Sequence, residues 1–268
     1  MYKRQDTALY EAKEHGGDQA RIYSGQEEGA LNWVKRIDAA IAHKRLVLHS
    51  QPIIDLRTGQ VTHHELLIRM VRDDGQLIAP DRFIPTAERF GLIGEIDRWV
   101  TDAGLRLALN GTPVAINLSG YSIGDEAIIA ATHAAVAQGL QPNTVIFEIT
   151  ETAALRNLAA ARAFAATLAD DGCAVALDDF GTGFGSFTYL KHIPAHYLKI
   201  DVDFVRELTT SNTDQEVVKA IVGIARSLGK QTIAEGVENP ETLALLREYG
   251  VDFAQGFHIA KPGPLDQS

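Results

Sequence analysis

The chain has 268 residues, and 46% of them are hydrophobic, enough to build one large core or two small ones. Its net charge of −10 excludes a global attraction to nucleic acid or anionic lipid, so an anionic substrate would need a local cation. The single cysteine, Cys173, excludes an internal disulfide. The sequence also has no apolar stretch long enough for a membrane span or a secretory leader, and together these two features predict a cytoplasmic protein.

The first 30 residues differ in pattern from the rest. Residues 1–25 hold a short helical stretch, Asp6–His15, then Gly16-Gly17 and a strand-like Ala20–Tyr23, too little to build a core. We expect them to be the end of a preceding domain. Residues 26–30 read as a polar linker, and residues 31–268 as the main domain.

From residue 31 onward, strand-length apolar runs alternate with amphipathic stretches of helical period. The expected strands are Leu46–Pro52, His64–Arg69, Val114–Leu118, Val145–Ile149, Ala174–Leu177, Tyr197–Ile200, Thr232–Ala234 and Phe253–Phe257. The expected helices are Leu31–His43, Gly94–Leu109, Gly124–Gln138, Ala153–Ala169, Asp214–Leu228 and Pro240–Tyr249. Such alternation predicts an α/β fold with a mainly parallel sheet, and eight strands in about 220 residues favour a TIM (β/α)8 barrel. A doubly wound open sheet is the alternative.

The strongest local signal is Asp178-Asp179, which ends the apolar run Ala174–Leu177 and precedes Gly181. Two carboxylates this close repel each other unless a cation lies between them, and Mg²⁺ and Mn²⁺ prefer oxygen ligands. A solvated acidic loop is the alternative for an isolated pair. Other strands of the chain argue against that alternative.

Oxygen-bearing side chains also occur at the ends of the other expected strands, where barrels place their active sites. Asn117 and Glu148 each lie within an apolar run, so burial would require them to be paired. The joint interpretation is one cation-binding floor formed by Glu65, Asn117, Glu148, Asp178, Asp179 and Glu235. No cysteine or histidine joins them at zinc-like spacing, which favours magnesium or manganese over zinc.

Five acids exceed what one divalent ion needs, so we expect two ions, an arrangement suited to in-line phosphoryl displacement by an activated water. Lys199 and Arg69 would stabilise phosphate oxygens, or Lys199 would orient the attacking water. A simple ion pair between Lys199 and an acid is compatible with either role. Glu238 and Asp201, taken individually, are expected to be solvated.

These residues carry a resemblance to the EAL domain, a bacterial phosphodiesterase family that acts on cyclic di-GMP. The matching segments are Gln51-Pro52-Ile53, Glu65-Leu66-Leu67-Ile68-Arg69, Asn117-Leu118-Ser119, Glu148-Ile149-Thr150-Glu151, Asp178-Asp179-Phe180-Gly181-Thr182-Gly183, Lys199-Ile200-Asp201, Ala234-Glu235-Gly236-Val237-Glu238 and Gln255-Gly256-Phe257. Residues 6–23 likewise resemble the closing helix and strand of a GGDEF domain, without its signature site, so residues 1–25 are expected to be the C-terminal remnant of such a domain.

The resemblance implies a modified TIM barrel with an antiparallel first strand and hydrolysis of cyclic di-GMP to linear pGpG. It implies that Glu65, Asn117, Glu148, Asp178, Asp179 and Glu235 bind magnesium or manganese, and that Lys199, Glu235 and Asp179 take part in catalysis. Gln51, Leu67, Arg69, Asp201 and Gln255 fall where the family contacts substrate or supports the site. Glu151 falls where the family anchors the loop after Asp179, and family habit predicts a homodimer.

Two positions depart from the family pattern. Leu66 replaces the usual alanine of the namesake triplet, and because it alternates away from Glu65 we expect it to change packing more than metal binding. Gly185 is an added glycine in the loop after Asp179, where it would loosen a gate over the site. These departures keep open a module that binds cyclic di-GMP as a sensor. A magnesium-dependent barrel enzyme that abstracts a proton is a third hypothesis.

Overall fold

The computed structural model describes residues 25–181 and 187–265. The GGDEF-like segment at residues 6–23 and the added Gly185 therefore lie outside the described residues. Within the described part, no helix is long and apolar enough to cross a membrane.

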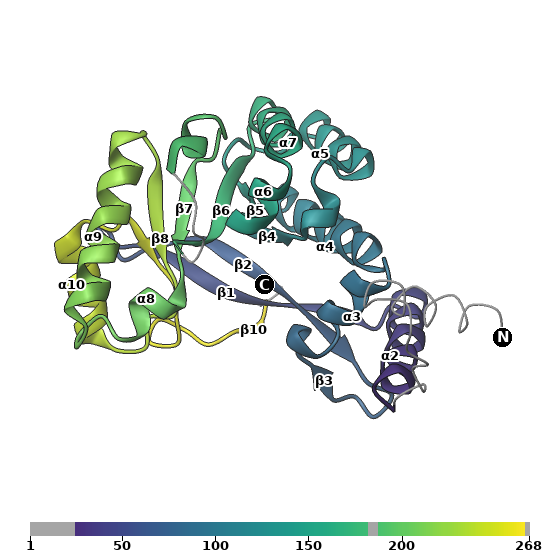
Figure 1. Cartoon of the computed structure of the whole chain (residues 1–268). Coiled ribbons are helices and arrows are strands. Elements are labelled where there is room, and N and C mark those ends of the chain that lie inside the picture. The colour runs from purple at the N-terminus through teal and green to yellow at the C-terminus, as the bar shows by residue number, and fades with distance from the viewer. Residues whose placement is uncertain (1–24, 182–186, 266–268) are drawn as a thin grey trace, which may run out of the picture.

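Eight of the described strands close into a barrel, with the helices packed outside it (Figure 1). They are β1 (Leu46–Asp55), β2 (Val61–Val71), β4 (Val114–Leu118), β5 (Val145–Thr150), β6 (Ala174–Phe180), β7 (Tyr197–Ile200), β8 (Gln231–Ala234) and β9 (Phe253–Ala254). From β2 to β9 each strand pairs in parallel with the next, and β1 pairs antiparallel with both β2 and β9. The predicted barrel with an antiparallel first strand is confirmed, and the open sheet is wrong because β1 closes the ring.

The reversed direction of β1 follows from the short connection to β2. The Asp55 carboxylate accepts hydrogen bonds from the backbone N–H groups of Arg57 (2.8 Å) and Thr58 (2.7 Å), and Gly59 follows with a φ of 73°. Such a tight turn can only join antiparallel neighbours, because a parallel crossover needs a dozen or more residues. The local turn chemistry thus sets the orientation of the whole strand.

The helices that correspond to the expected helical stretches are α2 (Gly25–Ala42), α4 (Ile93–Leu109), α5 (Glu126–Ala137), α6 (Glu151–Arg156), α7 (Leu158–Asp170), α9 (Asn212–Ser227) and α10 (Pro240–Tyr249). Because α2 begins at Gly25, the expected helix start at Leu31 is wrong and residues 26–30 are helical. The expected helix Ala153–Ala169 is two helices, because the backbone of Asn157 leaves the helical region and its side chain caps α7 by accepting from the Ala160 N–H (3.1 Å).

Several short elements escaped prediction because they lack a periodic pattern. They are β3 (Leu77–Ile78), β10 (Gly263–Pro264), α3 (Ile84–Arg89), α8 (Val202–Arg206) and the 3-10 segments Pro80–Arg82, Gly120–Ser122 and Phe187–Lys191. The α8 helix matters most for the site, since it directly follows β7 and its capping residue is Asp201.

The apolar core has two layers. A large cluster fills the space between the barrel and the helices, and a small cluster fills the barrel itself. The inner cluster consists of Ile53, Ala115, Ile146, Ala174, Ala176 and Ile233, with Tyr197 and Phe253 packed against it. Because side chains along a strand alternate between inside and outside, the residues two positions further on also point inward. Those positions carry the polar residues described next.

Candidate active site

A ring of polar side chains lies next to the inner apolar layer, two residues along the chain from a residue of that layer in every barrel strand except β2. Each barrel strand, or the residue that directly follows it, contributes one member: Gln51, Glu65, Asn117, Glu148, Asp178, Lys199, Glu235 and Gln255. All the expected metal ligands except Asp179 are in this ring, and Asp179 follows Asp178 directly. Residues far apart in the sequence are therefore gathered at one end of the barrel by the period-two pattern of its strands.

Lys199 is itself a member of the ring, and its ammonium group lies among the carboxylates of the other members. The Lys199 side chain is fully buried. Its Nζ is 2.6 Å from Glu148 Oε2, 2.7 Å from Glu235 Oε1 and 3.1 Å from Asp178 Oδ1. Glu65 Oε1 is further away, at 3.9 Å. The expected pairing of Lys199 with an acid is therefore observed, with several carboxylates at once.

A hydrogen-bonded chain of side chains fixes Glu65 from both sides. Asn117 Nδ2 donates to Glu65 Oε1 (2.6 Å), and Gln255 Nε2 donates to Glu65 Oε2. Gln255 Nε2 also donates to Gln51 Oε1 (2.9 Å), and Gln51 Nε2 donates to the Ala260 carbonyl (2.8 Å). The amides thus satisfy a buried carboxylate and hold it facing the centre of the ring.

The electrostatics of the ring follow from burial. Burial raises the pKa of Glu148 and of Glu235 above their ordinary values, although Lys199 opposes the shift in both. Burial alone would lower the pKa of Lys199, but the charges of Asp178, Glu148 and Glu235 outweigh it and hold that pKa well above its usual range. The ammonium form of Lys199 is therefore stabilised, and the carboxylates within 4 Å outnumber this one ammonium.

Asp179 and Asp201 extend the acidic region beyond the ring. Asp179 has a left-handed backbone (φ 53°), and burial, with the charges of Asp178 and Asp201, raises its pKa to about 6. Asp201 is only 8% exposed and accepts from the Asp203 N–H (2.7 Å) at the start of α8. The expectation that Asp201 is solvated is wrong, because capping and contact with Asp179 bury it.

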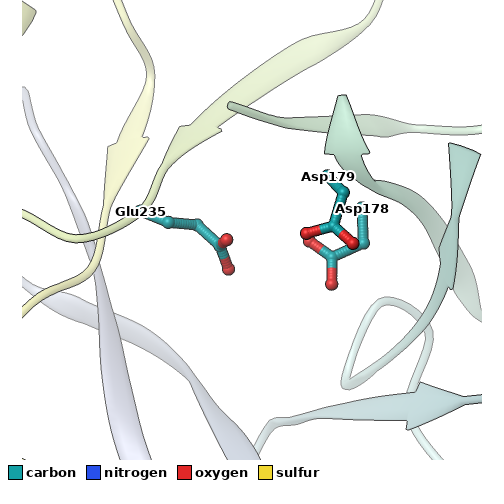
Figure 2. A group of neighbouring side chains, drawn as sticks. All are labelled: Asp178, Asp179 and Glu235. Carbon is teal, nitrogen blue, oxygen red and sulfur yellow. The ribbon is translucent and has the colours of Figure 1, made fainter. Parts of the chain in front are cut away.

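Three of the expected ligands form a group that suits a divalent cation. One oxygen from each of Asp178, Asp179 and Glu235 lies within 4.8 Å of the others. Figure 2 shows the two aspartates at the end of β6 with their carboxylates turned toward that of Glu235. In addition, Glu148 Oε1 is buried and accepts no hydrogen bond from any described residue, and Asp178 Oδ1 accepts none either, although it is ion-paired with Lys199. A site whose candidate ligand atoms are all oxygens, some of them without a hydrogen bond, fits magnesium or manganese.

A cavity of about 340 Å³ opens beside this group. Its lining includes the expected residues Gln51, Glu65, Leu67, Glu235 and Gln255, together with Val202, Arg206, Gly236, Glu238, Gly256 and Phe257. Sequence reasoning missed Arg206, on the unpredicted α8, and Phe257, an aromatic that is 59% exposed. The signal for Phe257 was its place directly after Gln255-Gly256.

Two further expected site residues lie away from the cavity lining. Arg69 is half-buried, and its Nη1 donates to the Ile68 carbonyl (2.9 Å). Glu151 is buried at the start of α6 and accepts from the Gly181 N–H (3.1 Å). The position of Glu151 next to the chain that follows Asp179 matches the expected anchor, whereas Arg69 does not line the described cavity.

Leu66 lies in the outer core, away from Glu65, as its alternation predicted. A Cβ on Gly104 of α4 would come within 3.0 Å of Leu66 Cδ1, so the glycine leaves the space that this leucine fills. The departure from the namesake triplet is thus accommodated by packing outside the barrel.

Comparisons with known proteins agree with this geometry. The EAL domain family matches residues 34–262. The chain is 37% identical over 281 residues to the cyclic di-GMP phosphodiesterase PdeB of Shewanella oneidensis, covering 99% of this chain and 33% of that protein. It is 36% identical over 239 residues to the cyclic di-GMP phosphodiesterase PdeF of Escherichia coli, covering 87% of this chain and 32% of that protein. The chain thus spans about a third of the length of these curated relatives.

Solved structures give the same assignment. The PaMucR phosphodiesterase in complex with c-di-GMP superposes with a TM-score of 0.82 at 34% identity, covering 88% of this chain and 99% of that one. The FimX EAL domain of Pseudomonas aeruginosa bound to c-di-GMP superposes with a TM-score of 0.81 at 29% identity, covering 87% and 96%. With its sequence, barrel and polar ring in agreement, the chain belongs to the EAL domain family.

Proposed function

We propose that this chain is a metal-dependent phosphodiesterase that hydrolyses cyclic di-GMP to linear pGpG. The observation that carries the proposal is the ring of polar side chains, in which several carboxylates surround Lys199 and Asp179 directly follows Asp178. The relatives named as cyclic di-GMP phosphodiesterases and the superposed c-di-GMP complexes support the choice of substrate.

The donor set fits two magnesium or manganese ions held by Glu65, Asn117, Glu148, Asp178, Asp179 and Glu235. When bound, such ions supply charge neutralisation at the phosphate and a more acidic water. Glu65 needs no reorganisation to take part, because Asn117 and Gln255 already fix its carboxylate. Asp178 and Asp179 are directed by the end of β6 toward the same point as Glu235.

The proton chemistry is assigned to Glu235 and Lys199. Glu235 lines the cavity and faces Asp178 and Asp179, so its carboxylate is placed to accept a proton from a water at the phosphate. It takes the proton of the attacking water as the new phosphorus–oxygen bond forms and one phosphorus–oxygen ester bond breaks in line, and the released ribose oxygen takes up a proton from solvent. The carboxylates around Lys199 stabilise its ammonium form, so it orients the water or stabilises a phosphate oxygen by donating hydrogen bonds.

The substrate would occupy the cavity next to the ring. Gln51, Leu67 and Gln255 line it, and the exposed ring of Phe257 offers a flat apolar face for a base. Arg69 and Asp201 remain proposed supports of substrate and site. A homodimer, a cytoplasmic location, no polymeric nucleic acid partner and a domain that begins near residue 31 also remain proposals.

The test is product formation. Wild-type protein incubated with cyclic di-GMP and Mg²⁺ or Mn²⁺ should yield pGpG by chromatography, and Asp178→Ala should lose more than about 100-fold of that rate. Asp102→Ala, an exposed carboxylate on α4, is the matched control and should retain full activity. Equal turnover in EDTA, or full activity of Asp178→Ala, would contradict the proposal.

The sensor hypothesis predicts a different result in the same experiment. It requires tight binding of cyclic di-GMP in Ca²⁺ and no turnover in Mg²⁺ or Mn²⁺. The filled ligand positions favour the enzyme over the sensor. A panel of non-phosphate substrates separates the enzyme from the third hypothesis, a proton-abstracting barrel.

A further inference from the structure

A buried carboxylate and a buried phenol outside the polar ring are hydrogen-bonded to each other. Glu151 follows β5 directly and is 2% exposed, and Tyr189, in the 3-10 segment Phe187–Lys191, is 5% exposed. Tyr189 Oη donates to Glu151 Oε1 (2.5 Å), while Glu151 Oε2 accepts from the Gly181 N–H (3.1 Å). Each oxygen of this carboxylate therefore holds a different segment of the chain.

The Gly181 contact acts on the backbone that presents the aspartates. Asp179 (φ 53°) and Gly181 (φ 102°) both have left-handed backbones, and this conformation costs a non-glycine residue about 1–3 kcal/mol. Gly181 is also closely packed, since a Cβ there would lie 3.0 Å from the ring of Phe204. The hydrogen bond from Gly181 to Glu151 thus helps to hold an unfavourable turn directly after Asp178 and Asp179.

The phenol in turn determines where the Glu151 carboxylate lies. Without the hydroxyl, Glu151 Oε1 would lose the donor that it has in a buried environment, and buried carboxylates rotate or protonate when a donor is lost. Burial and the charge of Glu151 raise the pKa of Tyr189, so the phenol stays a donor at neutral pH. Either response of Glu151 would loosen the contact with Gly181.

We propose that Tyr189 is a positioning residue for the metal site, acting through Glu151 and Gly181 on the placement of Asp178 and Asp179. The inference rests on the proposed function only in taking those two aspartates as metal ligands. It predicts an effect on metal affinity from a hydroxyl that does not itself belong to the acidic ring.

The test compares Tyr189→Phe with Tyr197→Phe, a matched loss of a hydroxyl at the other end of the barrel interior, where Tyr197 packs on Phe253. Mn²⁺ affinity is measured by calorimetry on the protein without nucleotide, and the Mn²⁺ dependence of turnover is measured separately. Tyr189→Phe should weaken Mn²⁺ binding about 10-fold, the lower end of the range for direct partners of metal ligands, because Tyr189 acts through Glu151 and Gly181. Turnover at saturating Mn²⁺ should stay within about threefold of wild type, and Tyr197→Phe should leave Mn²⁺ affinity unchanged.

Wild-type Mn²⁺ affinity in Tyr189→Phe would overturn the inference, even if the variant melts at a lower temperature. Should Tyr189→Phe fail to fold, Glu151→Gln, which keeps the side-chain size, must show the weakened Mn²⁺ binding, and unaltered binding would overturn the inference. Wild type that binds Mn²⁺ but does not hydrolyse cyclic di-GMP would refute the proposed function while the affinity comparison still tests Tyr189. Wild type that does not bind Mn²⁺ would overturn both.

Discussion

Replacing Lys199 should make the stability of the fold depend on divalent ions. Lys199→Met keeps the length of the side chain and removes the only ammonium within 4 Å of Glu148, Glu235 and Asp178 among the described residues. Removing one partner of a buried ion pair costs about 3–5 kcal/mol, because the remaining charge is left uncompensated. For a domain of this size each kcal/mol lowers Tm by roughly 2–4 °C, so Tm in EDTA should fall by about 6–20 °C.

The decrease in Tm caused by Lys199→Met should be smaller when another positive charge or a proton takes the place of the ammonium. Mn²⁺ would neutralise the same carboxylates, so the rise in Tm on adding Mn²⁺ should be larger for Lys199→Met than for wild type. Lowering the pH protonates Glu148 and Glu235, whose pKa values burial already raises, so the deficit should also be smaller at about pH 5 than at about pH 8.

Lys230→Met is the matched control for this experiment. Lys230 is half-buried, but its Nζ donates to the carbonyls of Ile193 (3.1 Å) and Ala195 (2.6 Å) instead of to carboxylates. Its loss should cost about 1–3 kcal/mol regardless of Mn²⁺. Differential scanning calorimetry in EDTA and in Mn²⁺ measures both variants. An Lys199→Met protein that melts with wild type in EDTA, or that loses as much Tm with Mn²⁺ as without, would refute the reasoning.

Three further predictions concern the same end of the barrel. Because the pKa of Asp179 is raised to about 6, Mn²⁺ must displace its proton below that pH, so affinity should fall about tenfold per pH unit there; titration calorimetry that finds equal affinity at about pH 5 and pH 7 would contradict this. By the same shift, folded Asp179 binds more protons than unfolded Asp179 between its ordinary 3.8 and about 6, so its contribution to metal-free stability declines as pH rises through that window. Gly236→Ala should destabilise the fold by about 1–3 kcal/mol in chemical denaturation, because Gly236 has a φ of 68° and a Cβ would lie 2.2 Å from Val202 Cγ2. Adding Val202→Ala to the Gly236→Ala variant should recover only the part of the lost stability that the clash causes. Full recovery would show that the backbone at residue 236 is unstrained.

The polar ring was predictable because its signal is local in each strand. Glu148 between Phe147 and Ile149, and Asn117 between Ile116 and Leu118, had to be buried and paired, and a barrel brings such strand positions to one end. The closure of the barrel followed from the number and order of the strands. The members of the polar ring could therefore be predicted, because their position inside the barrel depends on the period-two alternation along each strand.

Features that depend on how loops meet were not predictable in the same way. Asp201 lies between Ile200 and Val202 but after the end of β7, and its burial accompanies the capping of the five-residue α8 and the contact with Asp179. The alanine-rich stretch around Asn157 has a continuous helical pattern, yet this side chain starts a second helix. Lys199 was expected near phosphate or an acid, but its central place among several carboxylates depends on the stagger of the strands around the barrel.

The central claim is that the acidic ring binds divalent ions at the phosphate of cyclic di-GMP. The most direct test is a crystal structure with Mn²⁺ and the nucleotide, with the ions located by anomalous scattering. The proposal predicts two manganese peaks over Asp178 and Asp179, with Glu235 and the scissile phosphate beside them. A nucleotide bound in the cavity with no manganese peak at these carboxylates would contradict it.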